Sequence, residues 1–126
     1  MNQELEDIVR GAFKAVDNAD LKAFFNMMAD DIEQVDELTK KWSRGKANVV
    51  AALTPLFSIV TSIKSALSDF HATVSNDIAV VSCMLDQSYV LEGKVATIVA
   101  PTTCVLRRDT ATWKFILIHS LPFSDA

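Results

Sequence analysis

The 126-residue sequence has few of the residues that mark specialised protein classes. It contains only two cysteines, three glycines and three prolines. Two cysteines are too few for a disulfide-stapled scaffold, and so little glycine and proline excludes collagen-like and low-complexity chains. No apolar run approaches the roughly 18 residues that span a bilayer, so we expect no membrane partner. What remains is an ordinary globular protein whose length suits one domain, covering residues 1–126.

Positive charge is scarce as well. Twelve Lys and Arg residues oppose sixteen Asp and Glu residues, which leaves a net charge of −4. An acidic surface does not attract phosphate backbones or anionic lipids, so we expect no nucleic-acid partner. The first residues include Glu4, Glu6 and Asp7 rather than the basic and then apolar pattern of a signal peptide, which predicts a cytoplasmic protein.

Apolar residues at helical spacing predict two helices at the start of the chain. The first covers 5–16, with Asn2 as its N-cap. The second begins after Asp20, which is placed to cap it, and ends at 29–31. Asn18, in the break between them, is expected to adopt a left-handed conformation.

A third helix is predicted after Gly45, with an apolar stripe from 49 to 60. Pro55 interrupts this stripe. Because proline removes a backbone donor and clashes with the preceding turn, the helix either kinks there or restarts with Thr54 as its cap.

Residues 32–38 follow a period of two, which predicts a short strand before the third helix. Ile32, Gln34, Asp36 and Leu38 share one face of this strand.

The second half of the chain is rich in Val, Ile, Thr and aromatic residues and is strand-like throughout. Four long strands are predicted, at 63–75, 78–91, 94–108 and 112–121. The gaps between them are short, so consecutive strands form antiparallel hairpins. Pro101 cannot donate to a ladder and predicts a bulge or bend.

These strands are apolar on both faces. In the last one, alternation predicts one set of side chains on one face (Trp113, Phe115, Leu117, His119 and Leu121) and another on the opposite face (Ile116 and Ile118). Three helices shield only one side of the sheet. We therefore expect a second copy of the chain to cover the outer face, as a two-fold homodimer.

The order and spacing of these elements resemble the nuclear transport factor 2-like superfamily, which includes ketosteroid isomerases and SnoaL-like polyketide cyclases. The resemblance covers nearly the whole chain and rests on Asn18-Ala19-Asp20-Leu21, Ala29-Asp30-Asp31, Gly45, Val99-Ala100-Pro101 and the segment from Trp113 to His119-Ser120. It implies an α+β fold in which a cone-shaped, curved antiparallel sheet, of four long strands plus one or two short ones, wraps around three N-terminal helices. It also implies a homodimer and a pocket between the helices and the concave face.

The resemblance further suggests a catalytic residue. Ketosteroid isomerases move a proton with an aspartate base, while a tyrosine and a protonated aspartic acid hold the enolate oxygen. Asp36 has the family spacing of the base, five residues after Asp31 and nine before Gly45. Ala12 and Thr103 occupy the positions of the tyrosine and the acid, so steroid isomerase activity itself is not expected.

Asp36 has two readings from the sequence alone. On the face of Ile32 and Leu38 its carboxylate is partly desolvated, which suits a general base. At the edge of the sheet it is instead solvated, like its neighbours Glu33 and Glu37.

Four further residues are candidate pocket groups: Trp42, Tyr89, Thr103 and His119. Each has ordinary packing as its alternative, and His119 is equally suited to the core or to a subunit interface. The histidines lack Glu or Cys at ligand spacing, so no metal is expected. Nothing in the sequence argues for a cofactor, and none is expected.

The two cysteines, Cys83 and Cys104, fall near opposite positions of adjacent strands and are expected as free, buried thiols.

Two functions fit this sequence, and they differ in the interior of the fold. The first is a protein that binds an apolar small molecule, as an isomerase, cyclase or dehydratase with Asp36 as base. The second is a non-catalytic ligand-binding or dimerisation module. An open cavity of a few hundred cubic ångströms favours the first, whereas an interior filled by the seven Phe and four Met residues favours the second.

Overall fold

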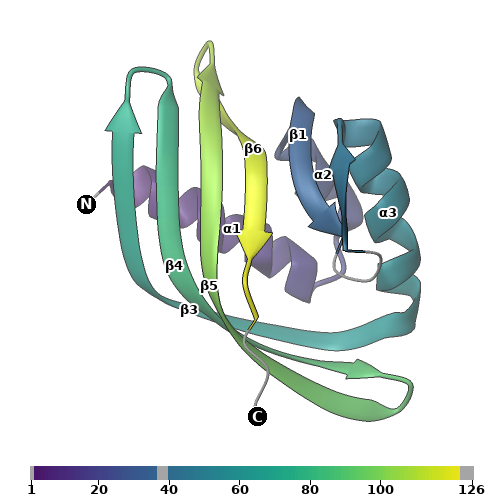
Figure 1. Ribbon diagram of the computed structural model, residues 1–126. Helices are drawn as coiled ribbons and strands as arrows, with labels where there is room; N and C mark the ends of the chain where they lie inside the picture. The colour runs from purple at the N-terminus through teal and green to yellow at the C-terminus, as the bar shows by residue number, and fades with distance from the viewer. Residues whose placement is uncertain (1, 37–39, 123–126) are drawn as a thin grey trace.

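The computed structural model describes residues 2–36 and 40–122 of the chain. Its elements follow in the order α1 (Gln3–Asp17), α2 (Leu21–Asn26), β1 (Met28–Asp36), β2 (Lys41–Arg44), α3 (Lys46–Ile59), β3 (Val60–Ser75), β4 (Ile78–Leu91), β5 (Lys94–Asp109) and β6 (Thr112–Ser120). The helices lie in the N-terminal half and the long strands in the C-terminal half, as an α+β fold (Figure 1). No helix in the described ranges is long and apolar enough to cross a bilayer.

The strands form one curved sheet in the order β2-β1-β6-β5-β4-β3. Neighbouring strands are antiparallel except β1 and β6, which are parallel, so the sheet is mixed and the prediction of a wholly antiparallel sheet was wrong. The physical reason is connectivity. Consecutive strands joined by short turns must run antiparallel, but α3 and three long strands separate β1 from β6 in the chain and leave their relative direction free.

The caps of the first two helices are confirmed. The Asn2 side chain accepts a hydrogen bond from the Leu5 N–H (3.3 Å), and the Asp20 side chain accepts one from Ala23 (3.2 Å). The left-handed residue between the helices is Ala19, with φ 54°, and not Asn18.

The second helix is shorter than predicted. It ends at Asn26, and residues 29–31 belong to β1 rather than to a helix end. Met28 and Ala29 are buried, and Met28 pairs with Phe115 of β6, so pairing with the sheet overrides the local helical spacing. The predicted strand 32–38 thus begins four residues earlier, and its positions 37 and 38 lie outside the described residues.

The third helix begins after Gly45, whose φ of 87° favours glycine. It continues through Pro55 as a single element. The Thr54 hydroxyl donates to the Val50 carbonyl oxygen (2.7 Å) one turn back, so Thr54 bonds within the helix rather than starting a new one.

The predicted hairpins are confirmed, and the one between β4 and β5 turns through Glu92 and Gly93, both with positive φ. The prediction of a bulge at Pro101 was wrong, because β4 and β5 keep one register along their whole length. The irregularities lie in β3, where Ser62 and Asp69 adopt left-handed φ at two register shifts, in the β5–β6 pair, and between residues 28 and 33 in the β1–β6 pair. Such bulges bend strands, and Figure 1 shows the long strands curving at one end of the sheet.

The bulge between β5 and β6 also changes which residues of β6 face the helices. Trp113 and Phe115 are buried, as predicted on one face, but Ile118 is buried with them. Leu117 and His119 pair with Val105 and Thr103 on the outer face. An extra residue in one strand moves every later side chain to the opposite face, which simple alternation does not anticipate.

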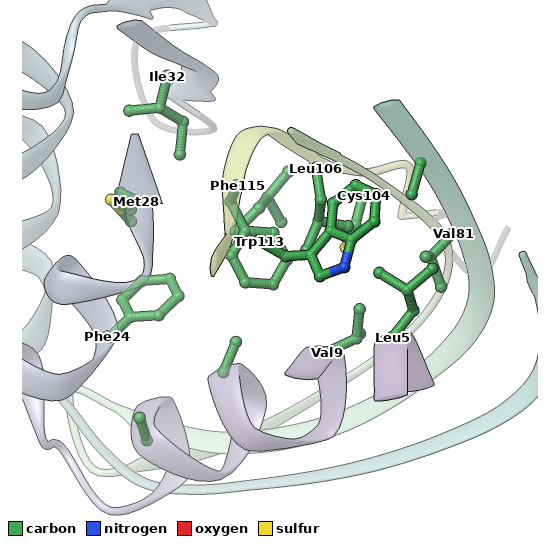
Figure 2. Packing of buried hydrophobic residues seen from close by; sticks show 14 of the residues in the cluster. Leu5, Val9, Phe24, Met28, Ile32, Val81, Cys104, Leu106, Trp113 and Phe115 are labelled. Atoms are coloured by element: carbon green, nitrogen blue, oxygen red, sulfur yellow. The ribbon is translucent and has the colours of Figure 1, made fainter. Parts of the chain in front are cut away.

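The core lies between α1 and the inner face of the sheet. Leu5 and Val9 of α1 point toward Cys104 and Trp113 on the strands (Figure 2). Both cysteines are free and buried, as predicted. Cys83 pairs with Thr102, so the two thiols are diagonal neighbours rather than directly opposite. Burial, with a smaller contribution from Cys83, raises the pKa of Cys104 to about 12.

Candidate functional site

A cavity of about 260 Å³ lies between the three helices and the inner face of the sheet. Thirteen of its seventeen lining residues carry apolar side chains, contributed by α1, α2, α3 and the long strands. The polar lining residues are Gln34, Gln87, Tyr89 and Ser120. A mostly apolar wall with a few polar groups is typical of small-molecule sites.

Strand alternation places these side chains. Leu85, Gln87, Tyr89 and Leu91 occupy every second position of β4 and all line the cavity. The residues at the intervening positions of β4 lie on the opposite, outer face of the sheet. Leu85 is buried beneath the helices, whereas the residues toward Leu91 border the open space of the cavity.

Gln87 is held by a hydrogen-bonded chain that starts at the end of α1. Ser65 donates to the Asp17 carboxylate through its backbone N–H (2.8 Å) and through its hydroxyl (2.7 Å), and Gln87 Nε2 donates to the Ser65 oxygen (3.0 Å). An ionised carboxylate only accepts, so the Ser65 hydroxyl must donate to Asp17 and accept from Gln87. This directs one N–H of the Gln87 amide toward Ser65 and leaves its second N–H and its carbonyl oxygen for other partners.

Ser120 is oriented by a buried threonine. The Thr102 hydroxyl, on the inner face of β5, lies 3.2 Å from the Ala100 carbonyl oxygen and 2.9 Å from the Ser120 hydroxyl. Thr102 has one hydroxyl proton. It donates this proton either to Ala100, with Ser120 then donating to Thr102, or to Ser120 itself.

Gln34 carries the unpaired polar atom of the site. Its Oε1 atom is buried and has no hydrogen-bond partner among the described residues. Leaving a buried acceptor unsatisfied costs roughly 1–3 kcal/mol. Gln34 pairs with Ile118 in β6, so it lies two residues along the sheet from Ser120, and the two polar groups share one wall.

The described lining of this cavity is uncharged. No Asp, Glu, Lys, Arg or His is among its described lining residues, and the described chain holds no cluster of three potential metal ligands. Arg107 forms a bidentate pair with Asp31 (2.8 and 2.9 Å) on the sheet's outer side. The hydrogen bonds from Arg107 lower the pKa of Asp31 below its usual value.

The structure separates the predicted pocket residues. Tyr89 lines the cavity, whereas Trp42, Thr103 and His119 are not among its lining residues. Trp42 lies on β2, 49% exposed, with the Arg44 guanidinium 5.4 Å from its ring. Thr103 and His119 are paired on the outer face. Asp36 ends β1, where its backbone pairs with Lys41, and its side chain lies outside the described part of the structure.

Three polar lining residues were missed from the sequence: Gln34, Gln87 and Ser120. A signal existed for two of them. Gln34 alternates with buried Ile32, and Gln87 alternates with Cys83 and Leu85, so each is an amide on an apolar face. Ser120 has no such signal, because the bulge in the β5–β6 pair decides which way it points.

Comparison with known proteins agrees with this architecture. The sequence profile of the SnoaL-like domain matches residues 5–123. Comparison with curated proteins gives no match.

Solved structures with the same fold include three proteins with different descriptions. A ketosteroid isomerase-like protein from Erwinia carotovora atroseptica is 18% identical (99% of this chain, 100% of that chain, TM-score 0.83). A nuclear transport factor 2-like protein from Cytophaga hutchinsonii is 17% identical (98% and 100%, TM-score 0.80). The CaMKII hub of S. rosetta is 19% identical (96% and 95%, TM-score 0.80). Because these similar structures carry different descriptions, the comparison establishes the fold, and the function has to be inferred from the site.

Proposed function

Because the chain belongs to the SnoaL-like domain family and its fold holds an open apolar cavity, we propose that it binds an apolar small molecule in that cavity. The observation that carries the proposal is the cavity itself. Its volume of about 260 Å³ remains open although Phe13, Phe24 and Phe57 are part of its wall. A module serving only for dimerisation has no need of such a space, and its side chains would be expected to fill it.

Filling the cavity tests this proposal. Ile98 lines it from β5, so Ile98→Trp places an indole in the space that a ligand needs. We expect this variant to bind the neutral fluorescent probe N-phenyl-1-naphthylamine at least about tenfold more weakly than the wild type. Thr97→Trp is the matched control, because Thr97 is exposed at the next position of the same strand. Equal fluorescence titrations for all three proteins, with circular dichroism confirming that they are folded, would contradict the proposal.

A catalytic form of this function is the second candidate. It is favoured by the position of β1, which brings Gln34 to the cavity and ends at Asp36. In an isomerase, cyclase or dehydratase, the Asp36 carboxylate would take a proton from the carbon next to a carbonyl. The electron pair moves to the carbonyl oxygen, near a donor such as the Tyr89 hydroxyl, and the acid returns the proton. Ala12 supports the non-catalytic alternative, because the resemblance places an oxyanion donor at its position, and Thr103, the second such position, lies on the outer face.

A homodimer through the outer face of the sheet is also part of the proposal. Ile78, Val80 and Val99 are exposed on this face, by 38%, 41% and 50%. Val80, Val105 and Leu117 lie side by side on three adjacent strands, so the apolar surface is continuous. Such a surface is typical of contacts between subunits.

A charge placed on this face should separate the subunits. We expect the wild type to sediment as a dimer at micromolar concentration and Val80→Lys to shift toward the monomer. Val74→Lys is the control, because Val74 is similarly exposed, at 46%, but lies at the edge of the inner face. Analytical ultracentrifugation distinguishes the species, and a monomeric wild type would refute the dimer.

A further inference from the structure

We propose that two copies of the chain meet along a row of polar side chains in the middle of the outer sheet face, and that protonation of His119 in this row separates them. This inference rests on the proposed homodimer and adds the centre of its interface and its response to pH. It comes from the pattern of side chains across the strands and from the place of His119 in that pattern.

The polar row crosses the central strands of the sheet. Thr103 of β5 pairs with Ser82 of β4 on one side and with His119 of β6 on the other. Ser82 in turn pairs with His71 of β3, so both histidines of the protein lie in this row. Because β5 and β6 are the middle two strands in the order of the sheet, the half-buried Thr103 and His119 lie near the centre of the outer face.

An apolar row lies on each side of the polar row. Alternation places the next outward side chains two residues away along each strand. They are Val80, Val105 and Leu117 in one direction and Met84, Pro101 and Leu121 in the other. The Leu121 N–H donates to the Pro101 carbonyl oxygen (2.9 Å), which continues the second row beyond the end of β6. None of these six side chains is charged, so the two rows offer no counterpart to a charged partner.

This pattern is complementary to itself. In a two-fold dimer the same surface of each subunit meets its own copy. An axis that passes through Thr103 in the plane of the interface, directed along the row or along β5, brings polar row against polar row and apolar rows against apolar rows. An axis displaced by one row would set the hydroxyl and imidazole groups against apolar side chains, where they lose their hydrogen bonds with water. A second copy of the chain is therefore the partner that this face fits.

The charge of His119 decides whether this contact forms. A neutral imidazole has one donor and one acceptor, so it can bond to the hydroxyl and imidazole groups of the other copy. An imidazolium has only donors, and dimerisation would remove its charge from water opposite an identical row. Because the contact accepts the neutral form, protonated copies must release a proton to associate. The dimer is therefore favoured above about pH 6.5, where an ordinary histidine titrates, and is weakened below it.

Within one copy, no carboxylate of the described residues forms an ion pair with His119. The closest in register, Glu33 of β1, lies opposite Leu117 and pairs with Arg44 of β2 (2.7 Å). The other charged groups around this face lie two or more rows from His119: Asp31, Asp86, Arg107, Asp109 and Lys114. The imidazolium thus has no anionic partner of its own subunit that would offset its burial.

Sedimentation equilibrium of the wild type at about pH 8 and about pH 6 tests this inference. An ordinary imidazole is only about one-quarter neutral at pH 6, so a dimer that needs two neutral copies should have a dissociation constant about tenfold higher there. His119→Gln keeps a side chain that hydrogen bonds but does not titrate, and its dissociation constant should change by less than about twofold. His71→Gln is the matched control, because His71 lies on the edge strand β3, and it should keep the tenfold change.

The outcomes separate the inference from the proposed dimer. A wild type that is monomeric at pH 8 overturns both. Equal dissociation constants at the two pH values, or a tighter dimer at pH 6, overturn the role of His119 and leave the dimer standing. A tenfold change that persists in His119→Gln, or that disappears in His71→Gln, refutes the assignment to His119. Circular dichroism at both pH values shows whether the separated chain is folded, and loss of the fold at pH 6 also refutes the inference.

The His119→Gln chain has one further informative result. If it is monomeric at pH 8, His119 is confirmed as part of the contact. The change in dissociation constant of the wild type and of His71→Gln then decides whether the contact responds to pH.

Discussion

Phe115→Ala lowers the free energy of unfolding by about 3–5 kcal/mol, the usual cost of removing a fully buried phenylalanine ring. The Phe115 side chain is 0% exposed and lies in the core between the sheet and α1 (Figure 2). The backbone of Phe115 also helps to join β6 to β1, because its N–H donates to the Met27 carbonyl oxygen (2.9 Å) just before β1 begins. Domains of this size are stable by only about 5–15 kcal/mol, so the loss is a large fraction of the total.

Urea denaturation of the wild type, Phe115→Ala and Phe57→Ala measures the free energy of unfolding of each protein, and Phe57→Ala serves as the comparison. Phe57 is half-buried on α3 and borders the cavity, so part of its surroundings is already empty. We expect its truncation to cost at least about 1 kcal/mol less than that of Phe115. Equal losses for the two variants would mean that the space next to Phe57 is closed in solution, contrary to the cavity described above.

Asp36→Asn is expected to lower catalysed proton exchange by about a hundredfold or more, if Asp36 is the base of the catalytic form. A suitable reaction needs no knowledge of the natural substrate. The exchange of α-protons of 2-tetralone for deuterium in D₂O, followed by proton NMR, measures removal and return of a proton next to a carbonyl. The asparagine side chain keeps the size of the carboxylate and cannot accept the proton, so the exchange rate reports on the base.

Glu33→Gln is the matched control for this substitution. Glu33 belongs to the same strand, but its carboxylate pairs with Arg44 (2.7 Å) on the surface. Its loss should leave the exchange rate unchanged. If the wild type and Asp36→Asn exchange at the same rate, the assignment of Asp36 as base is wrong. If the wild type does not exceed the buffer rate, the catalytic form is withdrawn and the binding function remains.

The sequence predicted well those features that depend on neighbours along the chain. The caps at Asn2 and Asp20 and the Glu92-Gly93 turn are decided by side chains within a few residues of one another. The long strands follow from β-branched and aromatic composition, and their bounds agree with the prediction to within three residues. The same local reasoning failed at residues 29–31, because the flanking residues Met28 and Glu33 pair with β6, a strand distant in sequence, and hold this segment in the sheet.

The candidate site was predictable only in part. The sequence placed Tyr89 among the pocket groups and put Ile32, Gln34 and Asp36 on one strand face, but it did not identify the amides as the polar groups of the wall. The direction of Gln87 depends on Asp17 and Ser65, which belong to two other elements. No spacing along β4 carries that information.

The amino-acid sequence by itself determined the class of the fold, the succession of helices and hairpins, and the apolar character of both sheet faces, because periodicity and turn chemistry act over a few residues. Only the tertiary structure decided that β1 joins β6 in parallel, that Leu117 and His119 point outward, and that an open, mostly apolar space remains inside. Those features arise from register shifts and contacts between distant segments, whose energies depend on how the whole chain packs.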